Sequence, residues 1–308
     1  MSNSKDDQKK KRDEEKSVKN KNSISAKRSP TRVLPERDLD KTQELSSPDF
    51  KIDREKSTRN AIILSGYSSR RVRYRSECPY IKDHWMCLRA LSRRPTPRFT
   101  LLYSHPNGSD LSDHLIGVPS LIDIARFYRC EVYSYDYSGY GISGGIASEK
   151  NVYADIRAVY EYITQEKRID PKRVVLLGFS IGSAATIELL RHEKDRKPAG
   201  VILQAPPTSI LRVIGTMIGR RDHLEKRTCC MDRFVTIDKI HEIEIPILII
   251  HGKEDHTVPI EHGELLCQRA VHKVTPEWVP EASHDNIENC RVVWRRIRKF
   301  VRQELKLK

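Results

Sequence analysis

Apolar residues in this chain form short runs, separated by longer stretches in which they recur with helical period. No run approaches the roughly 18 residues that a membrane helix needs, and the longest, Ile245 to Ile250, has the length of a strand. The runs predict strands at 99–104, 130–136, 173–177, 199–203, 246–251 and 276–279, with a short edge strand at 84–91. The periodic stretches predict helices at 114–128, 149–165, 181–193, 261–270 and 285–305. This alternation favours an α/β fold, a mostly parallel sheet with helices on both faces.

The first part of the chain has a different composition. Residues 1–58 hold 16 Lys and Arg and 12 Asp and Glu, with apolar residues only scattered among them. Such a stretch cannot bury enough apolar surface to offset the entropy that is lost on ordering. We therefore expect residues 1–70 to be a disordered, charged tail and residues 71–308 to form the α/β domain.

Two interpretations of the tail stay open. It is a solubilising extension, or its basic residues contact an anionic membrane surface, where each Lys or Arg contributes about 1 kcal/mol. The formal net charge of the whole chain is +14. No interleaved aromatic platform or recognised motif accompanies that charge, which disfavours nucleic acid as a partner.

The sequence also bears on the compartment. The first residues lack the apolar core of a signal peptide, so we expect a protein that is not secreted. The seven Cys are an odd number without framework spacing and without a Cys-x-x-Cys pair, which is typical of reduced intracellular thiols and not of a zinc site. We expect a cytoplasmic location. If the basic tail contacts lipid, we also expect peripheral contact with the cytosolic face of plasma or endosomal membranes.

The alternation of strand and helix is interrupted once, at residues 207–240. This segment connects two predicted strands, is basic and contains Cys229-Cys230. A connection of this length in a compact domain usually has a function of its own. We expect a cap-like excursion over the edge of the sheet.

A candidate nucleophile stands directly after the predicted strand 173–177. Gly178-Phe179-Ser180-Ile181-Gly182 is a G-x-S-x-G motif between a buried strand and a helix. A nucleophile on such a tight turn needs small residues on either side, because the chain passes close to itself there. The motif predicts that Ser180 presents its hydroxyl above the sheet, at the start of the helix.

A serine hydroxyl needs a base and an acid that orients the base, and position in the fold selects them. His284 lies between the last strand and the last helix, where hydrolases with the order Ser, acid, His place the base. Asp255 follows the preceding strand and is our choice of acid, with Glu254 as the alternative. Four other His lie in the edge strand or on or beside helices, and we expect them to be exposed to solvent: His84, His192, His262 and His272. Two end strands and are expected to brace loops: His105 and His251.

The oxyanion of an acyl-transfer reaction needs two backbone donors. The N–H of Ile181, the residue after the nucleophile, is expected to be one of them. The second is expected from Asn107, in the turn after strand 99–104. Pro106 stands before it, where a Gly is expected. Proline fixes φ near −65° but leaves the Asn107 N–H intact, so the oxyanion hole depends on whether the turn tolerates that φ.

A second motif points elsewhere. Residues 139–144 read G-x-G-x-x-G after a predicted strand, which is a dinucleotide fingerprint when it lies in the first βα unit and an acid ends the next strand. Here it follows two earlier strands, and the next strand has no terminal acid. A Gly-rich turn beside the pocket is the better interpretation.

Taken together, residues of about 75–305 resemble the α/β-hydrolase-domain-17 family of protein depalmitoylases. The resemblance rests on Tyr135 to Gly141 (YDYSGYG), Ser143-Gly144, Ser148-Glu149, 151–156 (NVYADI), the Ser180 motif, 248–252 with Glu254-Asp255, and Ser283-His284 with Ile287-Glu288. It implies an α/β-hydrolase fold, a catalytic triad of Ser180, Asp255 and His284, and a long acyl chain on a protein cysteine as substrate.

Three departures from the family pattern matter. Its His-Gly-Asn turn has Pro106 in the middle, and its usual Gln before the nucleophile is Phe179. Its palmitoylated N-terminal Cys cluster has no counterpart in residues 1–77, which contain no Cys. The resemblance therefore does not carry that mode of membrane anchoring to this chain.

The expected function is that of a serine hydrolase that cleaves long-chain acyl thioesters, with S-acylated proteins as partners and no metal or organic cofactor. The motifs point to acyl transfer, whereas the thioester rests on the resemblance. Two alternatives stay open: a lipid-ester hydrolase, and a catalytically weak binding protein that keeps the fold, which Pro106 motivates.

Overall fold

The structure is a computed structural model that describes residues 74–75, 87–91, 97–116, 119–220 and 224–307. The charged tail expected at residues 1–70 lies outside these residues and stays a prediction. The first three residues of the expected edge strand, 84–86, also lie outside them.

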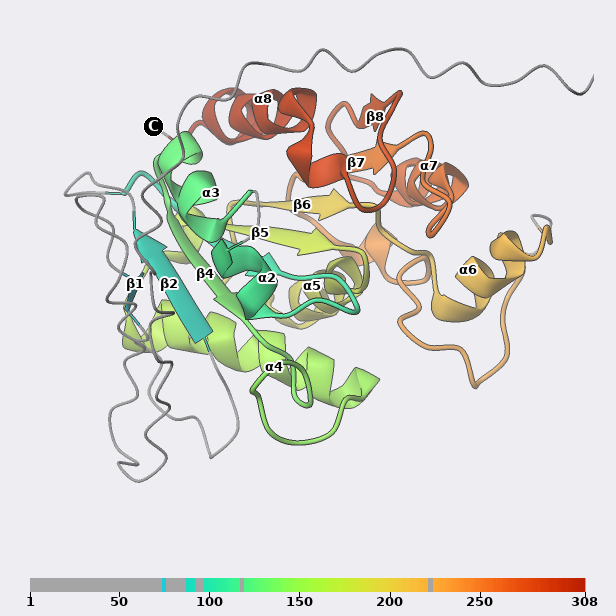
Figure 1. The fold of residues 1–308 in the computed structure, drawn as a ribbon, viewed down its shortest axis with the longest axis horizontal. Coiled ribbons are helices and arrows are strands. Elements are labelled where there is room, and N and C mark those ends of the chain that lie inside the picture. The colour runs from blue at the N-terminus through green and yellow to red at the C-terminus, as the bar shows by residue number, and fades with distance from the viewer. Residues whose placement is uncertain (1–73, 76–86, 92–96, 117–118, 221–223, 308) are drawn as a thin grey trace, which may run out of the picture. The chain divides into compact units, whose positions relative to one another are not determined.

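In the described part of the chain, eight strands form one sheet (Figure 1). Their order across the sheet is β1-β2-β4-β3-β5-β6-β7-β8. The pairs β1–β2 and β2–β4 are antiparallel, and all the other pairs are parallel. The predicted mostly parallel sheet is thus confirmed. The strands are β1 (Tyr74–Arg75), β2 (Cys87–Leu91), β3 (Thr100–Ser104), β4 (Glu131–Tyr135), β5 (Val174–Phe179), β6 (Gly200–Gln204), β7 (Ile247–Gly252) and β8 (Glu277–Val279).

Helices cover both faces of this sheet, as predicted. Figure 1 shows α3 and α8 on one side of it and α4 and α5 on the other. The helices are α2 (Leu111–Ile116), α3 (Leu121–Tyr128), α4 (Glu149–Glu161), α5 (Ile181–His192), α6 (Ile210–Met217), α7 (Ile260–Arg269) and α8 (Arg291–Lys299). Short turns of 3-10 helix precede or follow some of them: η2 (Pro171–Arg173), η4 (Ile240–Glu242) and η5 (Ile287–Asn289). Two π-helical turns extend α4 and α8: η1 (Tyr162–Glu166) and η6 (Phe300–Glu304).

Successive residues of each strand point to opposite faces of the sheet, so the apolar core has one part on each face. Leu102 and Leu176 pack with the apolar sides of α4, α5 and α7. Their neighbours Leu101 and Leu177 pack with α3 and α8 on the other face. The central strands are buried along their whole length, as β3 and β5 show. This is why the sequence of these strands reads as continuous apolar runs.

Three elements differ from the prediction. The helix expected at 114–128 is two helices, because Pro119 cannot continue α2 and Ser120 begins α3 with a capping box to Asp123. The last helix begins at Arg291, after the 3-10 turn η5, and not at residue 285. The two-residue strand β1 is too short to leave a periodic signal.

The segment 207–240 contains the helix α6, which the sequence analysis did not predict. In Figure 1, α6 lies beyond the carboxyl ends of β5 and β6. His262 of α7 joins it to the domain, with Nε2 2.9 Å from Thr216 Oγ1 and Nδ1 2.8 Å from Thr208 Oγ1. His262 is fully buried, and burial lowers its pKa to about 3. The expectation that His262 is exposed to solvent is therefore wrong, because the segment covers that face of α7.

No helix in the described residues is both long enough and apolar enough to cross a lipid bilayer.

The start of α5 packs directly against the end of β3. A Cβ atom at Gly182 would lie 2.1 Å from the carbonyl oxygen of Ser104, and one at Gly178 would lie 2.5 Å from the carbonyl oxygen of Gly182. Both obstacles are backbone atoms, so a larger residue displaces the chain itself. The two glycines of the motif thus bring α5, β3 and β5 together at one point.

We predict that Gly182→Ala lowers the free energy of unfolding by about 2–3 kcal/mol, because the added methyl group overpacks a backbone contact. The matched control is Gly215→Ala in α6, where the nearest heavy atom would be 3.8 Å from the new Cβ. The control is expected to raise the unfolding free energy by up to about 1 kcal/mol, since Ala favours a helix over Gly. Urea denaturation measures both. Equal stability of Gly182→Ala and the parent would contradict the close approach.

Candidate active site

Ser180 lies between β5 and α5 in a strained backbone conformation. Its φ is 53° and its ψ is −118°, which non-glycine residues rarely adopt. The surrounding backbone holds it there: the Ser180 N–H donates to the Gln204 carbonyl at 2.9 Å, and Ser183 Oγ donates to the Gly178 carbonyl at 2.8 Å. Although Ser180 is the N-cap of α5, its hydroxyl makes no capping hydrogen bond. The hydroxyl is therefore available for chemistry.

Asp255 follows β7 and is held as a carboxylate. Its Oδ1 accepts hydrogen bonds from the backbone N–H groups of Thr257 at 3.0 Å and Val258 at 2.7 Å. Burial alone would raise its pKa, but the neighbouring imidazoles of His251 and His284 and the Val258 N–H outweigh burial and lower the pKa well below its usual value. His251 also contacts the Val258 carbonyl through Nε2 at 2.7 Å, so it braces this loop as predicted. The loop thus presents a charged oxygen, Oδ2, toward His284.

His284 lies between β8 and η5, and its Nδ1 is 2.7 Å from Asp255 Oδ2. With Nδ1–H donating to the carboxylate, the neutral ring has its lone pair on Nε2, as a general base requires. The ring packs against Phe179, the residue before the nucleophile, with centroids 5.1 Å apart. No hydrogen bond joins Ser180 to His284 in the described structure; catalytic hydrogen bonds often tighten only when substrate is bound. The structure thus joins the predicted acid and base directly and places the base beside the nucleophile's strand.

The two expected oxyanion donors lie where β3 meets α5. Ile181 is the first residue of α5, so its N–H has no acceptor within the helix. The turn at 105–108 runs beside the elbow, because the carbonyls of Ser104 and His105 face Gly182. Within this turn only Gly108 has a positive φ. The fixed φ of Pro106 is therefore compatible with the turn that carries Asn107.

The segment Tyr135–Gly141 holds that turn from the other side. Tyr137 OH donates to the His105 carbonyl at 2.8 Å, and Tyr140 OH donates to Asn107 Oδ1 at 2.6 Å. The sequence analysis used this segment for the family resemblance and interpreted its glycines as a turn beside the pocket, but it assigned no role to Tyr140. The contacts indicate that it positions the residue whose N–H is the second candidate donor.

The glycines of the G-x-G-x-x-G sequence serve the fold of this loop. Gly139 and Gly141 have φ values of 80° and 51°. A Cβ at Gly139 would lie 2.6 Å from the Ala147 nitrogen, and one at Gly141 would contact the carboxylate of Asp136. These close approaches explain the motif without a nucleotide.

Glu288 is a buried acid that sequence reasoning left without a role. Its Oε1 accepts a hydrogen bond from Tyr103 OH at 3.0 Å. Part of the residue reaches the surface, but its carboxyl group is buried, and this burial raises its pKa to about 7. The Tyr103 hydrogen bond and nearby His284 act in the opposite direction and lower the pKa by less than burial raises it. A group that titrates near neutrality thus stands close to the candidate base.

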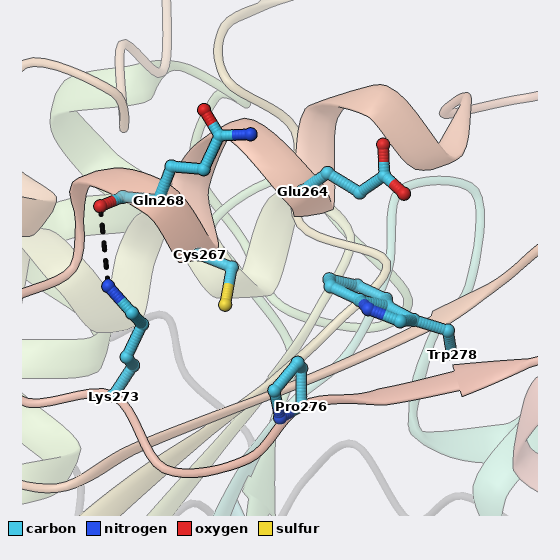
Figure 2. Close-up of a pocket in the computed structure, with 6 residues that line it drawn as sticks. All are labelled: Glu264, Cys267, Gln268, Lys273, Pro276 and Trp278. Atoms are coloured by element: carbon cyan, nitrogen blue, oxygen red, sulfur yellow. Dashed lines mark hydrogen bonds between the residues drawn. The ribbon is translucent and has the colours of Figure 1, made fainter.

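Two surface pockets lie beside α7, and no residue of the candidate triad lines either of them. Figure 2 shows the first, of about 560 Å³, in which the Cys267 thiol lies between α7 and the side chains of Pro276 and Trp278. Burial raises the pKa of Cys267, which disfavours a nucleophilic role for that thiol. The second pocket is lined by Leu224, Glu225, Lys226, Glu261, Glu264, Leu265 and Gln268. Among the described residues, no group of three or more His, Cys, Asp and Glu is arranged to hold a metal ion.

We predict that Glu288→Gln becomes more stable relative to the parent as pH rises. The folded carboxyl has a pKa of about 7 against an ordinary value of 4.5, so its contribution is fully present below 4.5 and is lost as pH rises through 7. Gln cannot ionise and still accepts the Tyr103 hydrogen bond. From pH about 5 to about 8.5 the variant is expected to gain about 1–2 kcal/mol on the parent, or a few degrees in Tm.

Thermal melts of both proteins at the two pH values measure this gain. The matched control is Glu264→Gln, which removes an exposed carboxylate on α7. A Tm difference between Glu288→Gln and the parent that does not change with pH would contradict the assignment.

Comparison with known proteins agrees with this geometry. The sequence profile of the prolyl oligopeptidase family matches residues 146–306. Alpha/beta hydrolase domain-containing protein 17B of Xenopus laevis is 41% identical over 214 residues, which cover 68% of this chain and 69% of the relative. The human 17B protein is 40% identical over the same shares of both chains.

Among solved structures, a sugar hydrolase from Lactococcus lactis has a similar fold. Its TM-score is 0.55 at 19% identity, and the match covers 74% of this chain and 97% of that protein. At this identity the likeness concerns the fold alone. The sheet topology, the Ser180 elbow and the sequence relatives agree: this chain is an α/β hydrolase that belongs to the alpha/beta hydrolase domain-containing protein 17 family.

Proposed function

We propose that this chain is a serine hydrolase that cleaves long-chain acyl thioesters from protein cysteines. The observation that carries the proposal is the 2.7 Å contact between His284 Nδ1 and Asp255 Oδ2, with His284 packed beside the strained elbow of Ser180. The Asp255 carboxylate, the His284 imidazole and the Ser180 hydroxyl are the three groups that nucleophilic acyl transfer requires.

In the first half of the reaction, His284 Nε2 takes the proton of Ser180 Oγ as that oxygen attacks the thioester carbonyl. The carbonyl oxygen becomes an oxyanion, which the N–H groups of Ile181 and Asn107 stabilise. When the tetrahedral intermediate collapses, the C–S bond breaks and the cysteine sulfur receives the proton from His284. The product is an acyl ester on Ser180.

In the second half, His284 removes a proton from water, which attacks the acyl ester. Collapse of the second intermediate returns the proton to Ser180 Oγ and releases the fatty acid. Asp255 stays charged throughout and stabilises the imidazolium that forms in each half. No step requires a cofactor or a metal ion.

The thioester substrate is supported by the depalmitoylase family that the motifs resemble. S-acylated proteins are the proposed partners, which places the enzyme in the cytoplasm at the cytosolic face of plasma or endosomal membranes. Contact of the basic N-terminal tail with anionic lipid is part of this proposal. A lipid ester would use the same site, so the leaving group distinguishes the two substrates.

We predict that Ser180→Ala, Asp255→Asn and His284→Ala each abolish hydrolysis of a palmitoylated cysteine peptide. Losses of roughly 10⁴-fold or more are expected, with Ser180→Ala the most complete because no acyl-enzyme forms. A fluorophosphonate probe is expected to label the parent and not Ser180→Ala. Ser112→Ala and His192→Ala, which change exposed residues of the same types, are the matched controls.

The outcomes separate the candidate functions. Faster turnover of a palmitoyl glycerol ester than of the thioester would favour the lipid-ester hydrolase. Absence of both labelling and turnover in a folded parent would favour a binding protein that retains the fold. If His284→Ala kept the parent rate, His284 would not be the base.

We predict that Tyr140→Phe lowers kcat about tenfold and leaves KM little changed, because Asn107, whose N–H is the proposed oxyanion donor, loses the side-chain hydrogen bond that holds it in place. The matched control is Tyr153→Phe, which removes a similar 2.8 Å hydrogen bond to Glu149 away from the site. Steady-state kinetics on the palmitoylated peptide measures both. A loss confined to KM, or equal losses in the two variants, would contradict a role for Tyr140 in positioning the oxyanion donor.

A further inference from the structure

The helix α6 has its polar side toward the domain and its apolar side toward solvent. Leu211, Ile214, Met217 and Ile218 lie within an arc of about 120° at 100° per residue, and their side chains are 37% to 65% exposed. We call these four residues the α6 ridge. An isolated surface helix of a soluble domain usually has the opposite arrangement.

The inward side is held by buried polar contacts. Arg212 is 2% exposed; its guanidinium donates to Ser209 Oγ at 3.2 Å and to the Lys226 carbonyl at 2.9 Å, and it lies 3.5 Å from Asp232 Oδ2. Thr216 contacts His262 on the same side. Together with Ile210, which packs against the apolar core, these bonds fix the rotation of α6 and leave the ridge exposed. The stability of the fold does not account for the ridge.

Exposed apolar side chains gather at this end of the sheet. Of the nine large apolar residues that are exposed in the described part of the chain, seven lie within 142–146 or 211–231. Both segments follow the carboxyl ends of strands, β4 and β6, at the edge where Ser180 lies. Residues just beyond the two segments are in contact: the N–H of Phe234, three residues after Met231, donates to the side chain of Glu149, three residues after Ile146, at 2.7 Å. Exposed apolar residues without a common role are scattered singly over a surface and do not concentrate at one end of a sheet.

The segment that carries the ridge has a positive formal charge. Segment 207–240 holds seven Lys and Arg and four Asp and Glu. Arg220 and Arg227, on either side of residues 221–223, are exposed, as are Glu225 and Asp238, whereas Asp232 is buried against Arg212. A convex apolar ridge with flanking cations fits the boundary between headgroups and acyl chains of an anionic bilayer.

We propose that the α6 ridge is a membrane-docking surface that inserts into the interface of an anionic lipid bilayer. Insertion buries Leu211, Ile214, Met217 and Ile218 among acyl chains and brings Arg220 and Arg227 to the lipid headgroups. The docked domain presents the carboxyl edge of the sheet, and with it Ser180, to the membrane surface. This surface is distinct from the N-terminal tail and does not depend on which bond the enzyme hydrolyses.

The test is sedimentation of the full chain with vesicles of phosphatidylcholine, alone or mixed with phosphatidylserine. Ile214→Gln/Met217→Gln removes ridge side chains without changing charge, and is expected to lower the partition coefficient on mixed vesicles about tenfold. Val271→Gln/Val292→Gln, which changes two exposed Val outside this edge, is the matched control and is expected to bind like the parent. Arg220→Gln/Arg227→Gln is expected to reduce the preference for phosphatidylserine by a similar factor.

Fluorophosphonate labelling of Ser180 in vesicle-free solution and thermal melts show whether each variant is folded. Equal vesicle binding of the parent and the ridge variant would overturn the proposal and assign binding to the tail. A parent that binds neither vesicle would also overturn it. So would a parent dimer that the ridge variant converts to monomer, in sedimentation velocity, with no change in vesicle binding.

Discussion

The backbone contact between the start of α5 and the end of β3 is the constraint on which the site depends. Gly182 lies so close to the Ser104 carbonyl that no side chain fits between them, and Gly178 likewise leaves no room for a side chain next to the backbone of Gly182. With these two glycines in place, Ser180 is held at a φ of 53° above the sheet. The same contact brings the turn that carries Asn107 beside the first N–H of α5. One close approach of two backbones therefore positions both the candidate nucleophile and the turn that carries the candidate oxyanion donor Asn107.

The other groups of the site are fixed by polar contacts from loops at the same edge of the sheet. Backbone N–H groups hold Asp255, which in turn orients His284. Tyr137 and Tyr140 hold the turn after β3, and each does so across more than thirty residues of sequence. The parallel sheet makes this convergence inevitable, because consecutive strands deliver their following loops to one edge. Rigid strands supply the placement, and the loops supply the chemistry.

The sequence predicted the elements that depend on local pattern. Buried strands such as β3 and β5 read as apolar runs, and the strand-to-helix context of the G-x-S-x-G motif located the elbow. Other features depend on contacts between distant segments. His262 lies on a helix whose exposed side could be judged only once α6 was known to cover it. The pKa of Glu288 is raised by burial of its carboxyl group, and the spacing of residues in the sequence does not reveal that burial. Pro119 was a local signal for the break between α2 and α3, and the helical period around it obscured that signal.

The helix α6 was not predicted from the sequence because its apolar side faces solvent and its buried side is polar. A helix is predicted from an apolar stripe that faces a core, yet the stripe of α6 faces solvent while Arg212 and Thr216 face the protein. Burying a guanidinium is costly unless its hydrogen bonds are satisfied. Here Ser209, Asp232 and the Lys226 carbonyl accept hydrogen bonds from the two terminal nitrogens of the guanidinium, which helps to hold the segment with its apolar residues outward. The α6 ridge is held rigidly at the edge of the sheet that carries the candidate nucleophile. In the docking that we propose, a lipid surface that binds the ridge therefore also lies close to Ser180.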